Sequence, residues 1–167
     1  MANVFKEQRL VDNNKRALIK YTATLDTAVA NTMIIDVSTL SLALNANSQI
    51  MSSNTHPKGL YRTTIKRIFG SAKANAYFTL LWQGANTADI VNIPTGRFDY
   101  DFQSMGDGAV IANPDTASNG DILLTIVTPS SADMLTLFVD LRKDSRDYDS
   151  GQTADPIAFN RGRAAGF

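Results

Sequence analysis

Hydrophobic and polar residues alternate with a period of two along much of this chain, and this alternation constrains the fold more than any other feature. The stretch from Asp121 to Lys143 is the strongest example. It predicts two strands, Ile122 to Thr128 and Met134 to Arg142, joined by a short turn. Because a hairpin alone is marginal in water, we expect this ribbon to need further strands or a second sheet over its apolar face.

Similar alternation, bounded by Gly, Pro, Asn and Ser, predicts further strands at 16–25, 32–37, 60–69, 77–83, 89–93 and 97–102, and a short one at 109–112. Residues 26–31 are typical of a hairpin connection, and residues 40–44 fit either a strand or a helical turn. In the strand 60–69, Ile65, Arg67 and Phe69 are expected to share a face. With no long amphipathic helix, the pattern predicts an all-β fold, an antiparallel β-sandwich of jelly-roll or Greek-key type.

The two ends of the chain differ from the alternating region, so we expect a β-sandwich domain at 16–143 with an N-terminal arm at 1–15 and a C-terminal arm at 144–167. Each arm is either a frayed end or a segment that becomes ordered on a neighbouring molecule. Large apolar, aromatic and arginine side chains are the types that anchor such contacts. The expected protein-interface residues are Phe5, Arg9, Ile157, Phe159, Arg161, Arg163 and Phe167.

Composition excludes several classes of chemistry. The chain has no cysteine, which excludes disulfides, thiolate catalysis and cysteine-ligated metals, and its single histidine, His56, leaves no histidine pair for a metal. Its 16 basic and 16 acidic residues balance, which argues against nucleic acid as a partner. No apolar run reaches the length of about 18 residues that spans a bilayer, and the first residues lack the apolar core of a signal peptide. We therefore expect an aqueous protein without a membrane partner.

One acidic segment is a candidate metal site. Asp144, Asp147 and Asp149 precede Gly151, but the glycine is misplaced for a calcium loop and Ala158 stands where a glutamate would be needed. The segment is therefore interpreted as a solvated acidic turn.

Asp99 and Asp101 lie two residues apart on the polar face of the strand 97–102. A glycosidase needs two carboxyl groups that face each other across a cleft, so pairing of these aspartates with Arg62 and Lys66 is the preferred interpretation. The sequence predicts no catalytic, cofactor or metal site, and we do not expect an enzyme.

Five basic residues and no acid lie between Lys58 and Lys73, interleaved with Tyr61 and Phe69. This is the composition of a nucleic-acid face. Aromatic residues at such positions more often serve the core, however, so an acidic protein surface is the preferred partner. Separately, Trp82 with Tyr77, Tyr100 or Tyr148 would form a sugar-binding platform if these rings were exposed.

The layout resembles a known class of proteins. A polar N-terminal segment, a compact all-β domain and the strand sequences RFDYDF, SNGDILLTIVTP and ADMLTLFVDLRK resemble small virion structural proteins of tailed bacteriophages, above all the capsid decoration or cement class. The resemblance covers residues 16–143. It implies a sandwich or jelly roll on the outside of the capsid, made in the host cytoplasm, whose partners are the major capsid protein and copies of itself in a trimer or dimer. The alternatives are a neck or tail connector, a fibre-attachment protein, or a carbohydrate-binding module.

Overall fold

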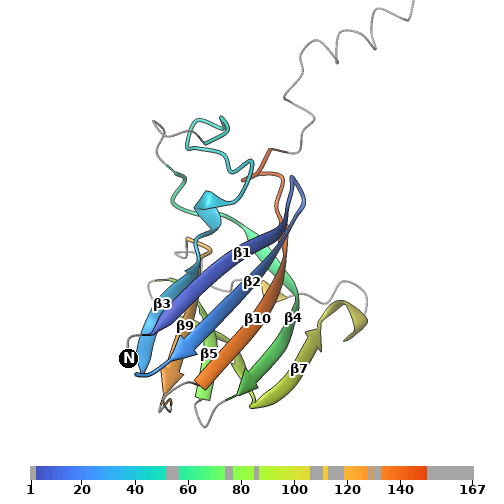
Figure 1. Ribbon diagram of the computed structural model, residues 1–167. Helices are drawn as coiled ribbons and strands as arrows, with labels where there is room; N and C mark the ends of the chain where they lie inside the picture. The colour runs from blue at the N-terminus through green and yellow to red at the C-terminus, as the bar shows by residue number, and fades with distance from the viewer. Residues whose placement is uncertain are drawn as a thin grey trace, which may run out of the picture.

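Two antiparallel sheets pack face to face in the computed structural model, which describes residues 3–51, 57–73, 77–84, 87–105, 111–112, 119–127, 129 and 133–149 (Figure 1). Sheet A contains, in spatial order, β1 (Val4–Asp12), β2 (Arg16–Leu25), β10 (Asp133–Lys143), β4 (Thr63–Lys73) and β7 (Gly96–Asp101), and β8 (Ile111–Ala112) pairs with β4. Sheet B contains β3 (Val29–Ile35), β9 (Ile122–Val127), β5 (Tyr77–Trp82) and β6 (Ala88–Ile93). The predicted all-β sandwich is confirmed.

The order of the strands identifies the type of sandwich. Strands from the first half of the chain pair antiparallel with strands from the second half, β2 with β10, β3 with β9, β4 with β7 and β5 with β6. Successive pairs alternate between sheets A and B. A ribbon of strand pairs that winds around a common core in this way is a jelly roll.

The predicted ribbon at 121–143 is wrong in its pairing. β9 and β10 do not pair with each other, because β9 belongs to sheet B and β10 to sheet A, where it lies between β2 and β4. The connection after β2 also crosses between the sheets, so the expected hairpin at 26–31 is wrong as well. Each of these strands has an apolar face, and strands in opposite sheets bury both faces in one core.

The strand β4 contains a bulge that the alternation pattern did not predict. Opposite β10, Ile65 pairs with Leu141 and Arg67 with Asp140, which leaves Lys66 as an extra residue. A bulge shifts the alternation by one residue. Ile65 and Ile68 therefore both face the core, whereas Arg67 and Phe69 turn to the outer face of the sheet. The prediction that Ile65, Arg67 and Phe69 share a face is wrong.

Each predicted arm contains residues that belong to the folded domain. Residues 4–12 form β1, whose backbone pairs with the edge of β2, so the arm predicted for 1–15 is a sheet strand over most of its length. Its side chains are mostly exposed, and for this reason the local sequence carries no sign of burial. At the other end, Asp147 and Tyr148 are buried against the domain. The five predicted interface residues from Ile157 to Phe167 lie outside the described residues.

The upper end of the sandwich, where β2 begins and β10 ends, is closed by loops (Figure 1). Residues 40–44 form neither a regular strand nor a helix but turns and isolated bridges. The fully buried Lys143 side chain joins this end together: its Nζ pairs with Asp12, donates to the Ser41 carbonyl at 2.8 Å and lies 5.0 Å from the Tyr148 ring. Of the described segments, only η1 (Val37–Thr39) and η2 (Gln103–Met105) are helical, and neither is long or apolar enough to cross a membrane.

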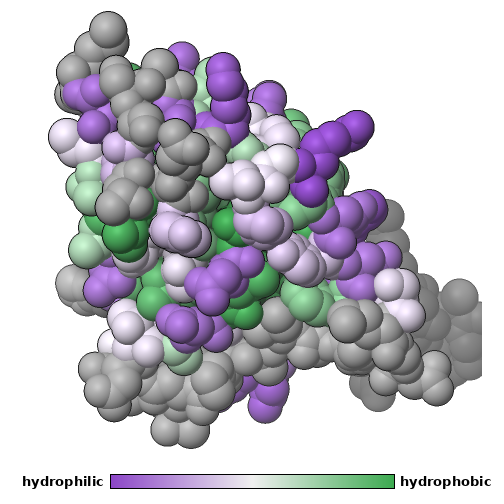
Figure 2. All heavy atoms as spheres, turned by 90° about the horizontal axis from the view of Figure 1, so that it is seen from below, coloured by the Kyte–Doolittle hydropathy of each residue, from purple (hydrophilic) through white to green (hydrophobic). Residues whose placement is uncertain are grey.

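The lower end, where β2 ends and β10 begins, is seen in Figure 2. Figure 2 shows hydrophobic residues near the centre of this end, with hydrophilic side chains between them and around the edge. The core between the sheets draws on both layers, and its largest fully buried side chains include Trp82 and Phe78 from sheet B and Ile19 and Ile65 from sheet A. Because the inner faces of both sheets form the core, the outer face of sheet A can differ in chemistry from the outer face of sheet B.

Candidate functional site

Basic side chains gather on the outer face of sheet A. The register of the strands assigns these residues to this face, because residues directly opposite one another share a face of the sheet. The bulged Lys66 has no register partner, and it is included because it lines the same hollow as Thr64 and Arg142. Eight basic residues lie there with three acidic ones: Lys6, Arg16, Lys20, Lys66, Arg67, Lys73, Arg97 and Arg142, with Asp99, Asp101 and Asp140. We call this surface the basic face. Since the whole chain is balanced, an equal acidic excess lies elsewhere in the sequence.

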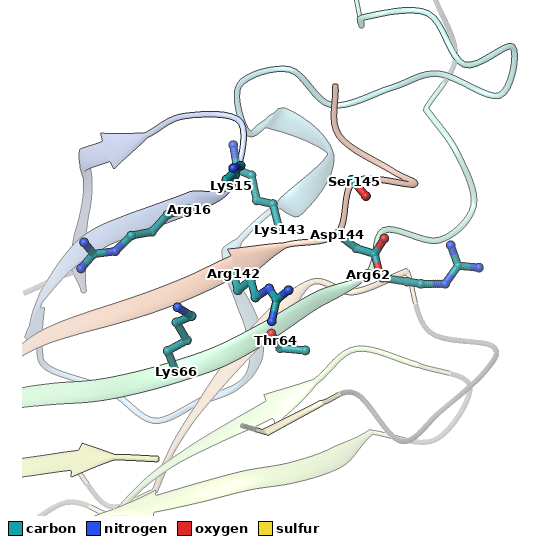
Figure 3. A pocket seen from close by; sticks show the side chains of 9 residues that line it. All are labelled: Lys15, Arg16, Arg62, Thr64, Lys66, Arg142, Lys143, Asp144 and Ser145. Atoms are coloured by element: carbon teal, nitrogen blue, oxygen red, sulfur yellow. The ribbon is translucent and has the colours of Figure 1, made fainter. Parts of the chain in front are cut away.

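The upper part of the basic face is hollowed into a cleft of about 780 Å³, which we call the basic cleft (Figure 3). Its side chains come from the turn before β2, from β2, from β4 and the residue before it, from β10, and from the segment that follows β10. They are Lys15, Arg16, Arg62, Thr64, Lys66, Arg142, Lys143, Asp144 and Ser145. Residues distant in sequence meet here only because β10 is inserted between β2 and β4.

Some cations of the basic cleft are already paired, and others are not. Arg16 donates to both Asp140 oxygens at 2.8 Å, which raises the pKa of the guanidinium. Among the residues that the structure describes, Lys15, Lys66 and Arg142 have no acidic partner within ion-pair distance. These three charges remain available to an anionic group.

The one acid among the lining residues does not neutralise these three cations. Asp144 is held by its neighbour Arg146, whose Nε donates to Oδ1 at 2.9 Å. This side-chain hydrogen bond, opposed by partial burial, lowers the pKa of Asp144 to about 2. The carboxylate is therefore ionised and already paired at neutral pH.

An aromatic pair lies on the basic face below the cleft. The rings of Phe69 on β4 and Phe138 on β10 stack with their centroids 4.7 Å apart and their planes within 3°. The Arg67 guanidinium lies 4.8 Å from the Phe69 centroid. A second hollow of about 440 Å³ borders Phe69 and is also lined by Arg97. Aromatic residues, including phenylalanine, and arginines are enriched in the buried centres of protein interfaces.

The sequence prediction missed this pair because it placed Phe69 in the core. A signal was present, however. Ile65 and Ile68 are three residues apart with two basic residues between them, a spacing that no regular strand can bury on one face. Such a spacing indicates a bulge, and the bulge at Lys66 turns Phe69 outward.

The predicted partners of Asp99 are wrong. Asp99 pairs with Arg67 on β4, whose Nε donates to Oδ1 at 2.8 Å and holds the pKa of the carboxyl below its usual value. Arg62 instead donates to Asp147, at 3.1 and 3.2 Å. The same bulge is the reason, because it brings Arg67 to the outer face beside β7.

The two predicted interface residues that the structure describes, Phe5 and Arg9, bind within the domain. Phe5 stacks on Tyr21 with centroids 6.0 Å apart. Arg9 donates from Nη1 to the Thr39 carbonyl and from Nη2 to the Thr39 hydroxyl, both at 2.5 Å. Neither lies on the basic face, and their contact with a partner stays a prediction.

The other candidates fall in the core or outside the described residues. Trp82 is 1% exposed and Tyr148 is fully buried, so the sugar platform weighed for these rings does not form, although Tyr77 is 74% exposed. His56 and Gly151 lie outside the described residues.

The acidic segment is packed against the domain rather than solvated as predicted. Asp147 and Asp149 are buried, and Asp147 accepts a hydrogen bond from the Arg62 amide at 2.9 Å. Within the described segments, no three histidines or acids cluster as a metal site would require.

No protein-family model, curated protein or solved structure matches this chain. Its function is therefore inferred from the jelly roll and from the chemistry of the basic face.

Proposed function

We propose that this chain is a non-enzymatic structural protein of a virus particle, a decoration protein that binds the assembled capsid shell and bridges neighbouring capsid subunits. The basic face is the observation that carries the proposal. A rigid jelly roll that gathers cations and an aromatic pair on one sheet has the chemistry of a protein docking surface.

Two physical effects favour such a role. Complementary charge speeds the encounter of a basic surface with an acidic one and selects against wrong partners. Once the body has docked, contacts made by the C-terminal segment at 150–167 become intramolecular, so weak contacts add to occupancy. The partners would be the major capsid protein and further copies of this chain, on the outer surface of the shell.

The proposal is tested on particles from the virus that encodes this chain. We expect quantitative mass spectrometry to find the chain in purified particles at a copy number comparable to that of the capsid protein. Particles stripped of the chain and incubated with a variant that lacks residues 150–167 should bind clearly less of it than of the full chain.

Two outcomes would contradict the proposal. Absence of the chain from purified particles would exclude a structural role in the virion. A few copies per particle, with rings of the isolated protein in electron micrographs, would assign it to the neck or tail instead of the shell. Equal binding of both forms would remove only the role of the C-terminal segment.

A further inference from the structure

We propose that the basic cleft binds an extended acidic segment of a protein, whose carboxylates pair with Lys15, Lys66 and Arg142. The inference rests on the proposed function, because the segment would belong to a capsid protein. It adds the place of binding on this chain and the chemistry of the partner.

A like-charge pair in the cleft is the first reason. Arg16 on β2 and Arg142 on β10 stand directly opposite each other in the register, where like charges destabilise a sheet. Arg16 turns to Asp140, and Arg142 is left without an acidic partner in the described part of the chain. A carboxylate bound between the two arginines would relieve this repulsion. In the described part of the chain Arg16 is compensated by Asp140 and Arg142 is not, so the Arg142 guanidinium is the group that a carboxylate of a partner would pair with.

The second reason is the pairing that the basic face already makes. Arg16 binds Asp140 through Nε and Nη2, both at 2.8 Å, and Arg67 binds Asp99 through two donors. Forked pairing of this kind matches the planar guanidinium to a carboxylate. The face thus binds carboxylates of its own chain in the geometry that it would offer to a partner.

The aromatic pair favours a peptide over a nucleic acid. Single-stranded nucleic acids bind by stacking bases on free ring faces, but Phe138 and Arg67 both lie over the Phe69 ring. The chain has a net charge of zero, so it also lacks the overall excess of basic residues that is typical of proteins that bind along a phosphate backbone. Both phenylalanines are half-buried, and their rings suit contact with aliphatic side chains. Phe138 lies four residues from Arg142 on β10, a separation of roughly 13 Å along a strand. We therefore expect acidic residues in the partner and an apolar residue about four positions away.

The inference is tested with the full chain and a fluorescent all-glutamate peptide, by anisotropy at low and high salt. We expect the peptide to bind and salt to weaken the binding. The variant Lys66→Gln/Arg142→Gln should bind the peptide about tenfold more weakly, because it removes two of the three free cations. The control variant Asn92→Asp/Thr87→Asp lowers the net charge equally at exposed positions of sheet B and its flanking loop, and it should change the affinity less than about twofold.

Further measurements identify the class of ligand and exclude misfolding of the variant. Single-stranded DNA of equal charge should bind more weakly than the peptide. The cleft variant should unfold at the same urea concentration as the unaltered protein or at a slightly higher one, because the Arg16–Arg142 repulsion is gone. Tighter binding of DNA, absence of peptide binding, or equal losses in both variants would overturn the inference. If these occurred while the chain was still abundant on particles, the inference would fail and the proposed function would stand.

Discussion

The outer faces of the two sheets cover the same core but differ in chemistry. The outer face of sheet A is basic, whereas the outer face of sheet B carries apolar side chains and a ladder of hydroxyl and amide groups. In this ladder the Thr79 hydroxyl donates to Asn92 at 2.8 Å and the Thr125 hydroxyl donates to Asn31 at 3.0 Å. Among the described outward residues of sheet B, Asp89 is the charged one. A jelly-roll core thus does not require charge on its outside, and the basic face of sheet A calls for a functional explanation.

The sheets also differ in what stabilises them. In the described part of the chain, all ion pairs lie on sheet A or in the loops of the upper end, and none joins strands of sheet B. We therefore expect sheet A to respond to substitutions of charge and to acid, and sheet B to respond mainly to changes in packing.

The largest effect is expected at Gly70, in the middle of sheet A. A Cβ added there would lie 2.0 Å from the backbone oxygen of Thr136 on β10, so the two strands would have to move apart. We expect Gly70→Ala to lower the free energy of unfolding by roughly 3–5 kcal/mol, as measured by urea denaturation. Gly59→Ala, which meets nothing within 4 Å, is the matched control. Equal stability of the two variants would mean that the close approach of β4 and β10 does not shape the basic face.

Apart from β1, which was expected to be part of an arm, alternation predicted the strands and most of their faces, because side-chain burial leaves a local pattern. The aliphatic face of β10 and the aromatic face of β7 agree with the alternation of these strands, and on β5 the buried Phe78, Leu80 and Trp82 alternate with Tyr77 and Thr79. Strand partners could not be predicted in the same way, because alternation reports which face is buried and not which strand lies alongside. A turn between the sheets has the same polar composition as a hairpin turn. For this reason β9 and β10 were wrongly joined.

The basic face depends on this missing information. Arg16, Lys66 and Arg142 are scattered over the sequence, and they converge only when β10 lies between β2 and β4. The bulge at Lys66 adds Arg67 and Phe69 to the surface. The basic stretch 58–73 is evident in the sequence, but local patterns do not tell which strands lie beside it, and for this reason they do not predict the cleft.

The second-largest effect on stability is expected at Asp12, at the upper end of sheet A, and it tests how far this sheet depends on charge. Burial disfavours the charge of Asp12, but hydrogen bonds from Lys143 and Ser41 outweigh it and hold the Asp12 pKa below its usual value. Burial likewise lowers the pKa of Lys143, and Asp12 offsets part of that shift. We expect Asp12→Asn to lower the free energy of unfolding by about 3 kcal/mol at pH 7, because it leaves a buried ammonium without its counter-ion.

The same substitution has a defined pH dependence. Since the pKa of Asp12 is lowered on folding, its contribution is complete above its unfolded-state pKa of about 3.8 and is lost as the pH falls through the folded-state value. Urea denaturation from pH 7 to pH 2 should therefore show the two proteins converge in acid. Asp89→Asn on sheet B should change the stability by less than about 0.5 kcal/mol. A constant difference across this range would show that packing, rather than charge, explains the effect of Asp12→Asn.

The smallest effect on stability is expected when one aromatic residue is removed from the outer face of each sheet, Phe138 from sheet A or Tyr77 from sheet B. Phe138 is half-buried and stacks on Phe69, so Phe138→Ala should lower the free energy of unfolding by about 1 kcal/mol. Tyr77 on sheet B is 74% exposed, and Tyr77→Ala should change it by less than about 0.5 kcal/mol. Binding should separate the two residues further: Phe138→Ala should lower the amount of chain bound to stripped particles, and Tyr77→Ala should leave it unchanged. If Tyr77→Ala instead caused the larger loss, the docking surface would lie on sheet B and the basic face would have to serve another purpose.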